Sequence, residues 1–463
     1  MTAMNLPDEF TSHTKSLLGD QWNQFCIALN QETPVSIRIN KDKTANDIRH
    51  LANVPWYDKG YYLNGRPQFT FDPLFHAGCY YVQEASSMFI GQIFEQYADN
   101  NIRVLDLCAA PGGKSTLIAD IIDTDSLLVS NEVIRSRSNI LAENMIKWGN
   151  PNVVVTNNDP EHIGRLNGFF DIILVDAPCS GEGMFRKDEN AITEWSVENV
   201  KLCKERQQRI LADIWPALKE GGILIYSTCT YNKDENEGNV LWMQDELGGE
   251  VLPVATKEEW NISPSMVEGI ATYRFFPHKT KGEGFFCAVL RKNTESGISE
   301  SRRKTKNHKD NKKKINLPTE YKEYLLAEET FVFYPKGDSW YGVPNGLHED
   351  ISYLNSQLNL ISEGICIGEF KGKDFIPDQS LAYSCCLNKE AFTCYEVDWK
   401  TAIAYLRKEA LVLPDQPKGY ILLTYKDKPL GFVKNIGNRA NNLYPQEWRI
   451  RSANIPEKEV AIL

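Results

Sequence analysis

The stretch from Ile102 to Lys292 alternates strand-like with helix-like segments, and this alternation is typical of a parallel sheet covered by helices. Each expected strand is a short apolar run rich in Val, Ile and Leu, as is usual for strands buried on both faces. We therefore expect a doubly wound α/β domain over residues 96–292. The expected strands are IRVLDLC (102–108), SLLVSNE (126–132), NVVVT (152–156), DIILVDA (171–177) and GILIYST (222–228).

Helical periodicity and turn signals fill the gaps between these strands. Amphipathic runs predict helices at 135–149 and from Val197 to Leu218, with Gly221 and Gly222 as the stop of the second helix. A turn-like segment between two further apolar runs predicts a hairpin that closes the sheet. These two runs are 271–278 and 284–292.

The chain of 463 residues is too long for one ordinary core, so we expect further domains on both sides. Residues 1–95 predict a small α+β module without chemistry of its own, in which PVSIRIN (34–40) is an alternating strand. After a linker at 293–316, the chain is strand-rich and aromatic, with no long helical period before about residue 398. We expect two small domains there, at 317–395 and 396–463.

The net charge of −11 argues against a protein that coats nucleic acid without specificity, because such binding depends on neutralising phosphates with Lys and Arg. The charge is unevenly distributed. Residues 301–314 hold eight Lys or Arg and one Asp, so this linker segment carries +7. Such a run predicts a solvated, disordered tether, and it leaves open whether the tether also contacts nucleic acid.

Other bulk features exclude several classes of protein. No run approaches the roughly 18 apolar residues that a membrane span needs, and the N-terminal MTAMNLPDEFTSHTK lacks the apolar stretch of a signal peptide. We therefore expect a cytoplasmic protein with no membrane partner. The eleven cysteines form no CxxC pair and match no zinc spacing, so we expect no metal site and mostly reduced, buried thiols.

A cofactor site is predicted where the first strand ends. Asp106 leads into CAAPGGKST (108–116), whose small residues let the backbone turn tightly and approach a ligand at the next helix N-terminus. Glu132 follows Gly112 by twenty residues, at the tip of the second strand, where an acid can accept hydrogen bonds from both hydroxyls of a ribose. A phosphate-binding P-loop would need Gly where Cys108 stands, and a GxGxxG dinucleotide motif is absent.

Two more acids end the next strands. Asp159 follows the third strand and could read an adenine, while Asp176 ends the fourth and would face the reactive end of the ligand. A single acid at a strand end is more often a turn or helix cap. Four acids on successive strand tips, at the face where open sheets bind ligands, favour an adenosyl-sulfonium cofactor.

Two cysteines are predicted at the same face. Cys179 follows the fourth strand in DAPCSGEG, and Cys229 follows the fifth in STCTY. A thiolate that adds to C6 of a cytosine turns the ring into an enamine whose C5 can accept a methyl group, and loss of the C5 proton then releases the thiolate. The residues alone leave open which thiol does this.

The motifs DLCAAPGGKST, NE at 131–132, VDAPCSGEGMFRK and YSTCTYNKDENE resemble the NOL1/NOP2/Sun family of RNA cytosine-5 methyltransferases over roughly residues 80–290. The resemblance implies a Rossmann-like class I methyltransferase domain that uses S-adenosylmethionine. It implies that Cys229 is the nucleophile, that Cys179 assists release of the product, and that Asp176 is shared with the base. The implied cofactor contacts are Cys108, Ala109, Ala110, Pro111, Gly112, Gly113, Lys114, Glu132, Asp159 and Asp176.

Within that family, GMFRKD and the C-terminal segment 431–450 are most similar to bacterial members that act on small-subunit ribosomal RNA and end in a PUA-like RNA-binding domain. One physical argument agrees with Cys229 as nucleophile. The segment after it predicts a helix start with Asp234 and Glu235 in the first turn, and a nearby helix N-terminus favours a thiolate.

Several residues are candidates for RNA contact. Arg186 and Lys187 could hold a phosphate or orient the target base, and Phe185 and Tyr231 could stack on an unstacked base. The C-terminal end offers Asn438, Arg439 and Tyr444. Three alternatives stay open: the same chemistry on transfer RNA, a non-catalytic ribosome-assembly protein, and a methyltransferase for a small molecule or protein.

Overall fold

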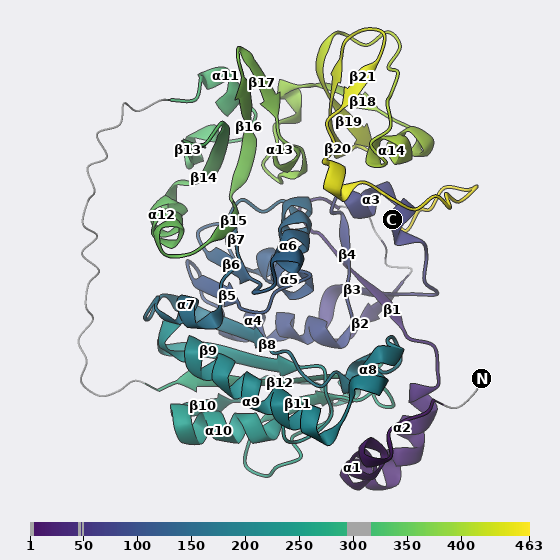
Figure 1. Cartoon of the computed structure of the whole chain (residues 1–463), viewed down its shortest axis with the longest axis vertical. Coiled ribbons are helices and arrows are strands. Elements are labelled where there is room, and N and C mark those ends of the chain that lie inside the picture. The colour runs from purple at the N-terminus through teal and green to yellow at the C-terminus, as the bar shows by residue number, and fades with distance from the viewer. Residues whose placement is uncertain (1–3, 45–47, 49–50, 294–315) are drawn as a thin grey trace.

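The computed structural model describes residues 4–44, 48, 51–293 and 316–463 (Figure 1). The described chain forms a large central sheet and three sheets of four strands. The basic run at 301–314, including Lys312, Lys313 and Lys314, lies outside the described residues. In the part of the chain that is described, no helix has the length and apolar character needed to cross a membrane.

The central sheet has the strand order β10-β12-β9-β8-β5-β6-β7-β15, with β11 added to β12. Five of these strands run parallel, and the chain order reverses between β5 and β8. This confirms the doubly wound class, which places a ligand crevice at the reversal. The parallel strands are β5 (Arg103–Asp106), β6 (Leu127–Asn131), β7 (Val153–Thr156), β8 (Phe170–Asp176) and β9 (Leu218–Thr228); the others are β10 (Gly249–Leu252), β11 (Thr272–Phe275), β12 (Phe285–Lys292) and β15 (Leu360–Glu363).

Helices cover both faces of this sheet and create two apolar cores. One face packs against α4 (Ile90–Tyr97), α5 (Gly113–Ile121) and α6 (Arg135–Trp148). The other packs against α7 (Pro160–Gly164), α9 (Val197–Ile214), α10 (Glu237–Leu247) and α12 (His348–Gln357). Because both faces are buried, the strands read as continuous apolar runs.

The predicted end of the long helix is wrong. Helix α9 ends at Ile214, and Gly221 and Gly222 lie within β9. Pro216 explains the earlier end, because it has no backbone N–H to continue the helix. Gly221 instead adopts a positive φ of 72°, which a residue with a side chain rarely adopts.

The described part of the N-terminal module has three helices and a sheet in the order β2-β3-β1-β4. Strand β1 is buried at all five positions, so the predicted alternation is wrong. It is covered because Arg38 reaches across to Asp120 of α5, at 2.5 Å, with neither side chain exposed. The elements are α1 (Asp8–Leu18), α2 (Trp22–Leu29), β1 (Val35–Ile39), β2 (Ala52–Val54), β3 (Tyr57–Leu63), α3 (Pro73–His76) and β4 (Tyr80–Val82).

The C-terminal region forms two sheets, but it also completes the central domain. Strand β15 pairs antiparallel with β7, at the edge of the central sheet. Helix α12, which was not predicted, packs Ile351 and Leu354 into the same core as Leu105. Figure 1 shows β15 beside β7 and α12 next to them. The predicted segment 317–395 therefore shares its core with the central domain.

The two C-terminal sheets have the orders β13-β14-β16-β17 and β18-β19-β20-β21. The second packs its helix α14 against the N-terminal module, and the Trp399 ring N–H donates to the carbonyl of Phe71. Their elements are α11 (Thr319–Lys322), β13 (Phe331–Lys336), β14 (Ser339–Pro344), β16 (Ile365–Lys371), β17 (Asp374–Pro377), α13 (Gln379–Tyr383), β18 (Thr393–Glu396), α14 (Trp399–Leu406), β19 (Gly419–Tyr425), β20 (Lys428–Asn435) and β21 (Ala440–Asn442).

Candidate active site

A cavity of about 180 Å³ lies at the carboxyl ends of β5 and β8, where the strand order reverses. One wall is the turn after β5, from Cys108 to Lys114, together with Asp106 and Asp176. The opposite wall comes from β4 and the residues after it, Tyr81 to Glu84, and from Ser87. The segment 1–95 therefore supplies one wall of the cavity, although none of the candidate catalytic residues lies in it.

The turn after β5 is shaped by small residues. Gly112 has a φ of 117°, which glycine adopts without strain, and it immediately precedes α5. A Cβ at Gly112 would also lie 3.3 Å from the Leu141 side chain. The Ala109 N–H donates to the carbonyl of Asn131, which ties the turn to the end of β6. Six of the seven residues of the predicted loop 108–114, all but Gly112, line the cavity.

Asp106 is fully buried at the floor of this cavity. Its Oδ2 accepts from the Ser115 hydroxyl at 2.7 Å, while its Oδ1 has no hydrogen-bond partner among the described residues. Burial raises the pKa of Asp106 to about 7. A buried acceptor without a partner is costly, so this atom fits a site whose ligand brings a hydrogen-bond donor.

This pKa shift predicts how stability depends on pH. The folded pKa of about 7 lies above the ordinary 3.8. The folded state thus keeps a proton that the unfolded state has lost, and stability falls as pH rises through this window. We therefore compare the free energy of unfolding of Asp106→Asn with that of the wild type, measured in urea. This difference should favour Asp106→Asn by about 2 kcal/mol more at pH 8 than at pH 5. An equal difference at both pH values would contradict the shifted pKa.

The other two predicted cofactor acids lie apart from the cavity lining. Glu132 is 3% exposed, accepts from the Ile134 N–H at 2.9 Å, and pairs with Arg137 at 3.1 Å. Asp159 caps α7 by accepting from the Glu161 N–H at 3.1 Å. Glu132 thus stands at the tip of β6 as predicted, whereas Asp159 has the geometry of a helix cap.

Asp176 lies between two donors at the mouth of the cavity. Its Oδ2 is 2.7 Å from the Lys114 ammonium, and its Oδ1 accepts from the Ser227 hydroxyl at 2.7 Å. Burial lowers the pKa of Lys114, but the charge and hydrogen bond of Asp176 outweigh it and raise the pKa overall. The cofactor turn, β8 and β9 are thereby joined by one charged group.

The two candidate thiols lie in contact. The sulfur atoms of Cys179 and Cys229 are 3.1 Å apart, and the Cys229 N–H points to the Cys179 sulfur at 3.4 Å. The hydrogen bond to Cys229, and then burial, raise the pKa of Cys179 well above its ordinary value. Cys179 therefore keeps its proton at neutral pH and can donate it to the Cys229 sulfur.

Buried acids that were not predicted hold the two cysteine loops in place. Glu182 accepts from the backbone N–H groups of Tyr231 and Asn232, at 2.6 and 2.9 Å. Glu235 accepts from the Ser180 N–H at 3.0 Å and from the Asn232 side chain at 2.8 Å. Each acid thus links the loop after β8 to the loop after β9.

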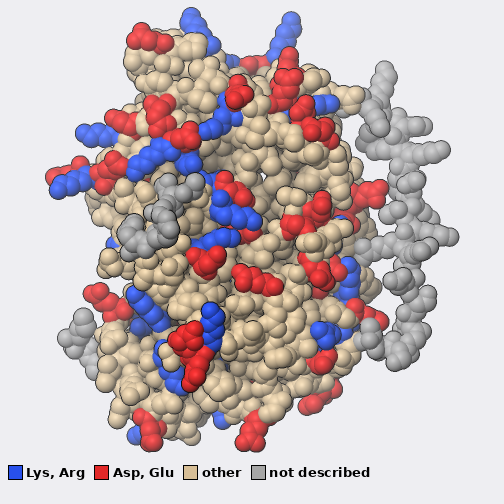
Figure 2. Space-filling model, turned by 180° about the vertical axis from the view of Figure 1, so that it is seen from behind, with Lys and Arg blue, Asp and Glu red and all other residues tan. Residues whose placement is uncertain are grey.

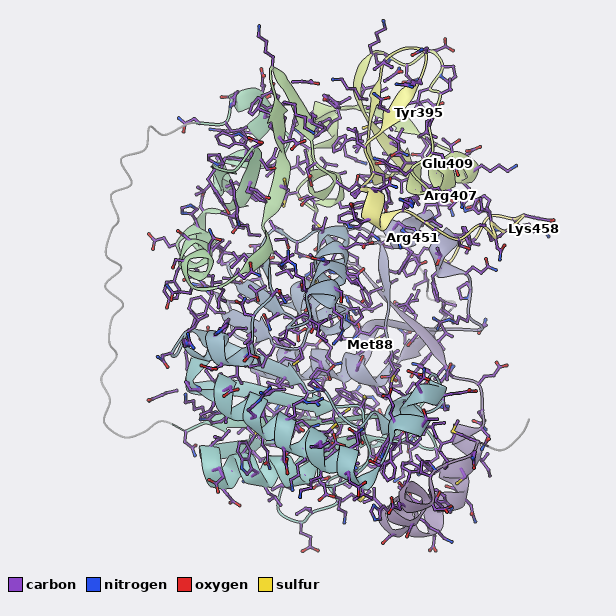
Figure 3. The ribbon with its side chains drawn as sticks, viewed as in Figure 1. Met88, Tyr395, Arg407, Glu409, Arg451 and Lys458 are labelled. Carbon is purple, nitrogen blue, oxygen red and sulfur yellow. The ribbon has the colours of Figure 1, made fainter. Side chains whose placement is uncertain are left out.

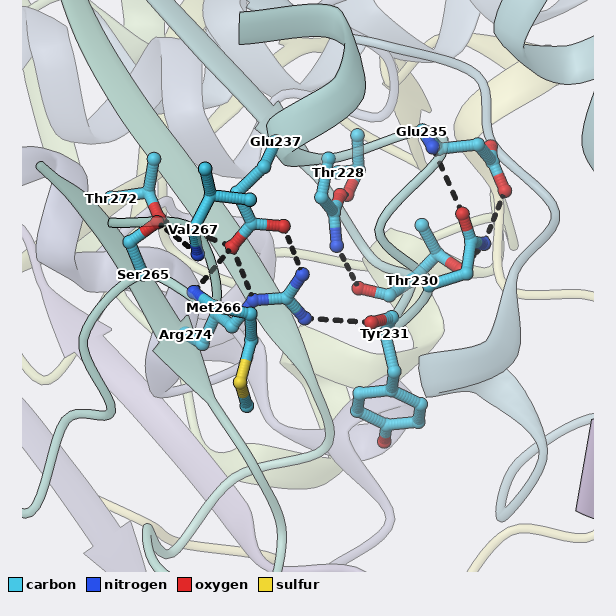
Figure 4. A network of polar contacts seen from close by, with 12 residues as sticks. Thr228, Thr230, Tyr231, Glu235, Glu237, Ser265, Met266, Val267, Thr272 and Arg274 are labelled. Atoms are coloured by element: carbon cyan, nitrogen blue, oxygen red, sulfur yellow. Dashed lines mark hydrogen bonds and ion pairs between the residues drawn. The ribbon is translucent and has the colours of Figure 1, made fainter. Parts of the chain in front are cut away.

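The helix start that was predicted just after Cys229 is wrong. Helix α10 begins at Glu237, and Glu235 lies in the turn before it, fully buried. Figure 4 shows Glu237 paired with the buried Arg274, whose guanidinium also donates to the Tyr231 carbonyl at 2.6 Å. Glu235 and Glu237 are bonded within the polar network of this loop. A helix N-terminus next to Cys229 therefore cannot be used as evidence that Cys229 is a thiolate.

Three residues expected to contact RNA at this loop are buried in the protein. Arg186 is 5% exposed and pairs with Glu283 at 2.9 Å, while Phe185 packs against Phe10. The Tyr231 ring is covered and stacks on a neighbouring Phe. Of this group, only Lys187 keeps a partly exposed charge, 3.5 Å from Glu283.

The C-terminal candidates divide in the same way. Asn438 and Arg439 are exposed, whereas Tyr444 is fully buried and cannot stack on a base. Arg407, at the end of α14, pairs with Glu409 at 2.6 Å (Figure 3). Figure 2 shows acidic and basic side chains interspersed over the face opposite to Figure 1, with no broad face of one sign.

Three family models match the chain. The model described as 16S rRNA methyltransferase RsmB/F matches residues 95–291. The N-terminal domain of 16S rRNA methyltransferase RsmF matches 6–85, and the methyltransferase RsmF PUA domain matches 392–450. A ribosomal RNA small subunit methyltransferase F from Escherichia coli O157:H7 is 30% identical over 482 residues, which cover 95% of this chain and 96% of that protein.

The chain belongs to the RsmF family. A second relative of the same name, from Vibrio cholerae, is 28% identical and covers 98% of this chain and 99% of its own length. A solved methyltransferase homologue from Pyrococcus horikoshii is 29% identical, with a TM-score of 0.53, and covers 62% of this chain and 96% of its own. The family's PUA model confirms the PUA-like end that the sequence predicted.

Proposed function

We propose that this protein methylates carbon 5 of a cytosine in small-subunit ribosomal RNA. The observation that carries the proposal is the pair of sulfur atoms, 3.1 Å apart, in loops after β8 and β9 next to the Lys114–Asp176 pair. The printed names of the relatives, ribosomal RNA small subunit methyltransferase F, support the substrate. Within the described residues no cluster of side chains could hold a metal ion.

The cavity fits S-adenosylmethionine, which would supply the methyl group. Asp106 offers a buried acceptor without a partner, and the turn after β5 offers backbone groups at a helix N-terminus. We propose that the cofactor is held by Glu132 and by the turn of small residues, with Asp159 and Asp176 as further contacts. The turn comprises Cys108, Ala109, Ala110, Pro111, Gly112, Gly113 and Lys114.

The reaction assigns a different step to each thiol. The Cys229 thiolate adds to C6 of the cytosine, which forms a carbon–sulfur bond and moves the ring electrons toward C5, the carbon to be methylated. C5 would then take the methyl group from the sulfonium of the cofactor, which would leave as a neutral thioether, and removal of the C5 proton returns electrons to the ring and breaks the carbon–sulfur bond. Cys179, which keeps its proton beside Cys229, returns a proton to the departing sulfur, and Asp176 is shared with the base.

The substrate is tested by mapping 5-methylcytosine in cellular RNA with and without this protein. The proposal expects one small-subunit ribosomal position to lose the modification when the protein is removed. If 5-methylcytosine were lost only from transfer RNA, the substrate would be transfer RNA and not ribosomal RNA. Unchanged RNA, together with a defect in ribosome assembly, would favour a non-catalytic protein.

The ribose contact predicts a defect in cofactor binding. Glu132→Ala removes an acceptor at the tip of β6, so the affinity for S-adenosylmethionine should weaken by about 1 to 3 kcal/mol in calorimetry. Glu161→Ala is a matched control, because this carboxylate is 66% exposed and pairs with Arg165 on the surface. If both variants bind like the wild type, Glu132 is only a turn residue.

We also propose a domain division and a location. The family matches at 6–85, 95–291 and 392–450 support a module at 1–95, a methyltransferase domain at 96–292, and an RNA-binding PUA-like domain at 396–463. Between them lie the linker 293–316 and the segment 317–395. A ribosomal RNA substrate supports a cytoplasmic location, which microscopy of a tagged chain tests directly.

A further inference from the structure

A second cavity, of about 640 Å³, lies between α1 and the first turns of α9. It is separate from the cofactor cavity, and no residue lines both. Trp195, Val197 and Val200 supply apolar surface. Lys201, Lys204 and Lys233 supply positive charge at its edge.

This cleft opens at the substrate edge of the central sheet. A helix that joins two parallel strands starts at their carboxyl ends, so the first turns of α9, between β8 and β9, lie at that edge. Asn232 lines the cleft and follows Cys229 by three residues, which limits their Cα separation to about 11 Å. The cleft is therefore a neighbour of the thiol pair.

The wall of the cleft is bonded directly to the cysteine loops. Glu182 lines the cleft and accepts from the Asn232 N–H at 2.9 Å, and the next N–H, of Gly183, donates to the Cys229 carbonyl at 2.8 Å. The Glu182 carboxylate also accepts from the Trp195 ring N–H at 3.0 Å. With the Tyr231 N–H and the Asn232 side-chain amide, four internal donors thus surround its negative charge.

The charged side chains that line the cleft favour the binding of an anionic ligand. In the described part of the chain, no carboxylate lies within 4 Å of the ammonium groups of Lys201, Lys204 or Lys233. Lys201 and Lys233 are exposed, and the described acids that line the cleft are Glu182, which is used internally, and Asp234. A polyanion with apolar faces, such as a nucleic-acid strand, matches three free cations beside apolar side chains.

We propose that this cleft binds the RNA strand next to the target cytosine. The lysines contact its phosphates, and the apolar side chains of α9 contact a flanking base. This inference rests on the proposed function, because the cytosine at Cys229 sets where the strand must pass. The cleft would hold the strand in place while the cytosine is turned toward the thiols.

The test measures RNA binding by the full-length protein as a function of salt. The probe is a single-stranded RNA of about 16 nucleotides with one cytosine, and its binding is measured by fluorescence anisotropy. Lys204→Gln/Lys233→Gln should weaken binding about ten-fold and flatten the slope of log affinity against log salt by about 1.4, since each phosphate contact in single strands contributes roughly 0.7. The affinity for S-adenosylmethionine should not change.

A matched control removes two charges at the other end of the strands. Lys219 lies near the amino end of β9, and Arg291 lies on the neighbouring strand β12. Each forms an ion pair on the surface. Lys219→Gln/Arg291→Gln should leave the RNA affinity and the salt slope unchanged. Equal effects of both double variants, or no effect of Lys204→Gln/Lys233→Gln, would overturn the inference.

A second variant tests the cleft without touching a lysine. Ser16 is exposed on α1 and lines the cleft, so Ser16→Glu adds a negative charge there and should also weaken RNA binding several-fold. Wild-type RNA affinity in Ser16→Glu would contradict the assignment. If the wild type bound RNA without transferring a methyl group, the proposed function would fail, and the cleft would still be judged by its salt slope.

Discussion

Replacing Cys229 with Ala should lower the rate of methyl transfer to RNA by about a thousand-fold or more. The variant keeps the cavity and the Lys114–Asp176 pair but has no group to add to C6. Without that addition, C5 of cytosine is a poor nucleophile. Single-turnover assays with radiolabelled S-adenosylmethionine measure the loss.

Two controls separate chemistry from folding in this experiment. Cofactor binding to Cys229→Ala, measured by calorimetry, should match the wild type. Cys203→Ala is a matched change of a buried cysteine in α9 and should retain most of the activity. Substantial methyl transfer by Cys229→Ala, with Cys179→Ala inactive, would reverse the roles of the two thiols.

Replacing Arg38 with Met should destabilise the protein by about 3 to 5 kcal/mol. Arg38 and Asp120 are both unexposed, and removal of the guanidinium leaves a buried carboxyl without its cation. Burial raises the pKa of Asp120 to about 6 even beside Arg38, so proton uptake limits the cost at low pH. Urea unfolding at pH 8 measures the full effect.

The Arg38 side chain also connects the N-terminal module to the cofactor turn. Its guanidinium donates to Gln83 of the cavity wall, at 2.9 Å, and to the Thr116 hydroxyl in α5. The double variant Arg38→Met/Asp120→Leu should recover much of the lost stability, because no charge stays buried. If the double variant is less stable than Arg38→Met, the pair is not the source of the cost.

The strand ends could be predicted from the sequence because period and composition determine where buried parallel strands stop. Asp106, Asp176, Cys179 and Cys229 all follow such runs, and the structure places them around one edge of the sheet. Their individual roles were taken from family resemblance. No local pattern distinguishes a thiol that attacks from one that assists.

Contacts between distant segments could not be predicted in this way. The sequence gives no sign that Glu182 is buried, and it predicts Glu235 in a helix first turn, but each accepts from a backbone N–H about fifty residues away in the sequence. Arg186 read as a free cation for the same reason, although Glu283 neutralises it. The partner of a charged residue is set by tertiary structure, which local patterns do not contain.

The C-terminal region also contributes to the central domain, which matters for any truncation of the chain. Deleting the chain from about residue 300 would remove β15 from the central sheet and the α12 side chains Ile351 and Leu354 from its core. We therefore expect such a truncation to lose stability, and RNA contacts are better tested by substitutions in the full-length chain.

The covalent step is tested most directly with Cys179→Ala. This variant keeps the Cys229 thiol but lacks the group that assists release, so protein should accumulate bound to RNA. On a denaturing gel we expect a slowly migrating band that nuclease removes and that is absent from Cys179→Ala/Cys229→Ala. A band that persists in the double variant, or one formed by Cys229→Ala instead, would contradict Cys229 as the nucleophile.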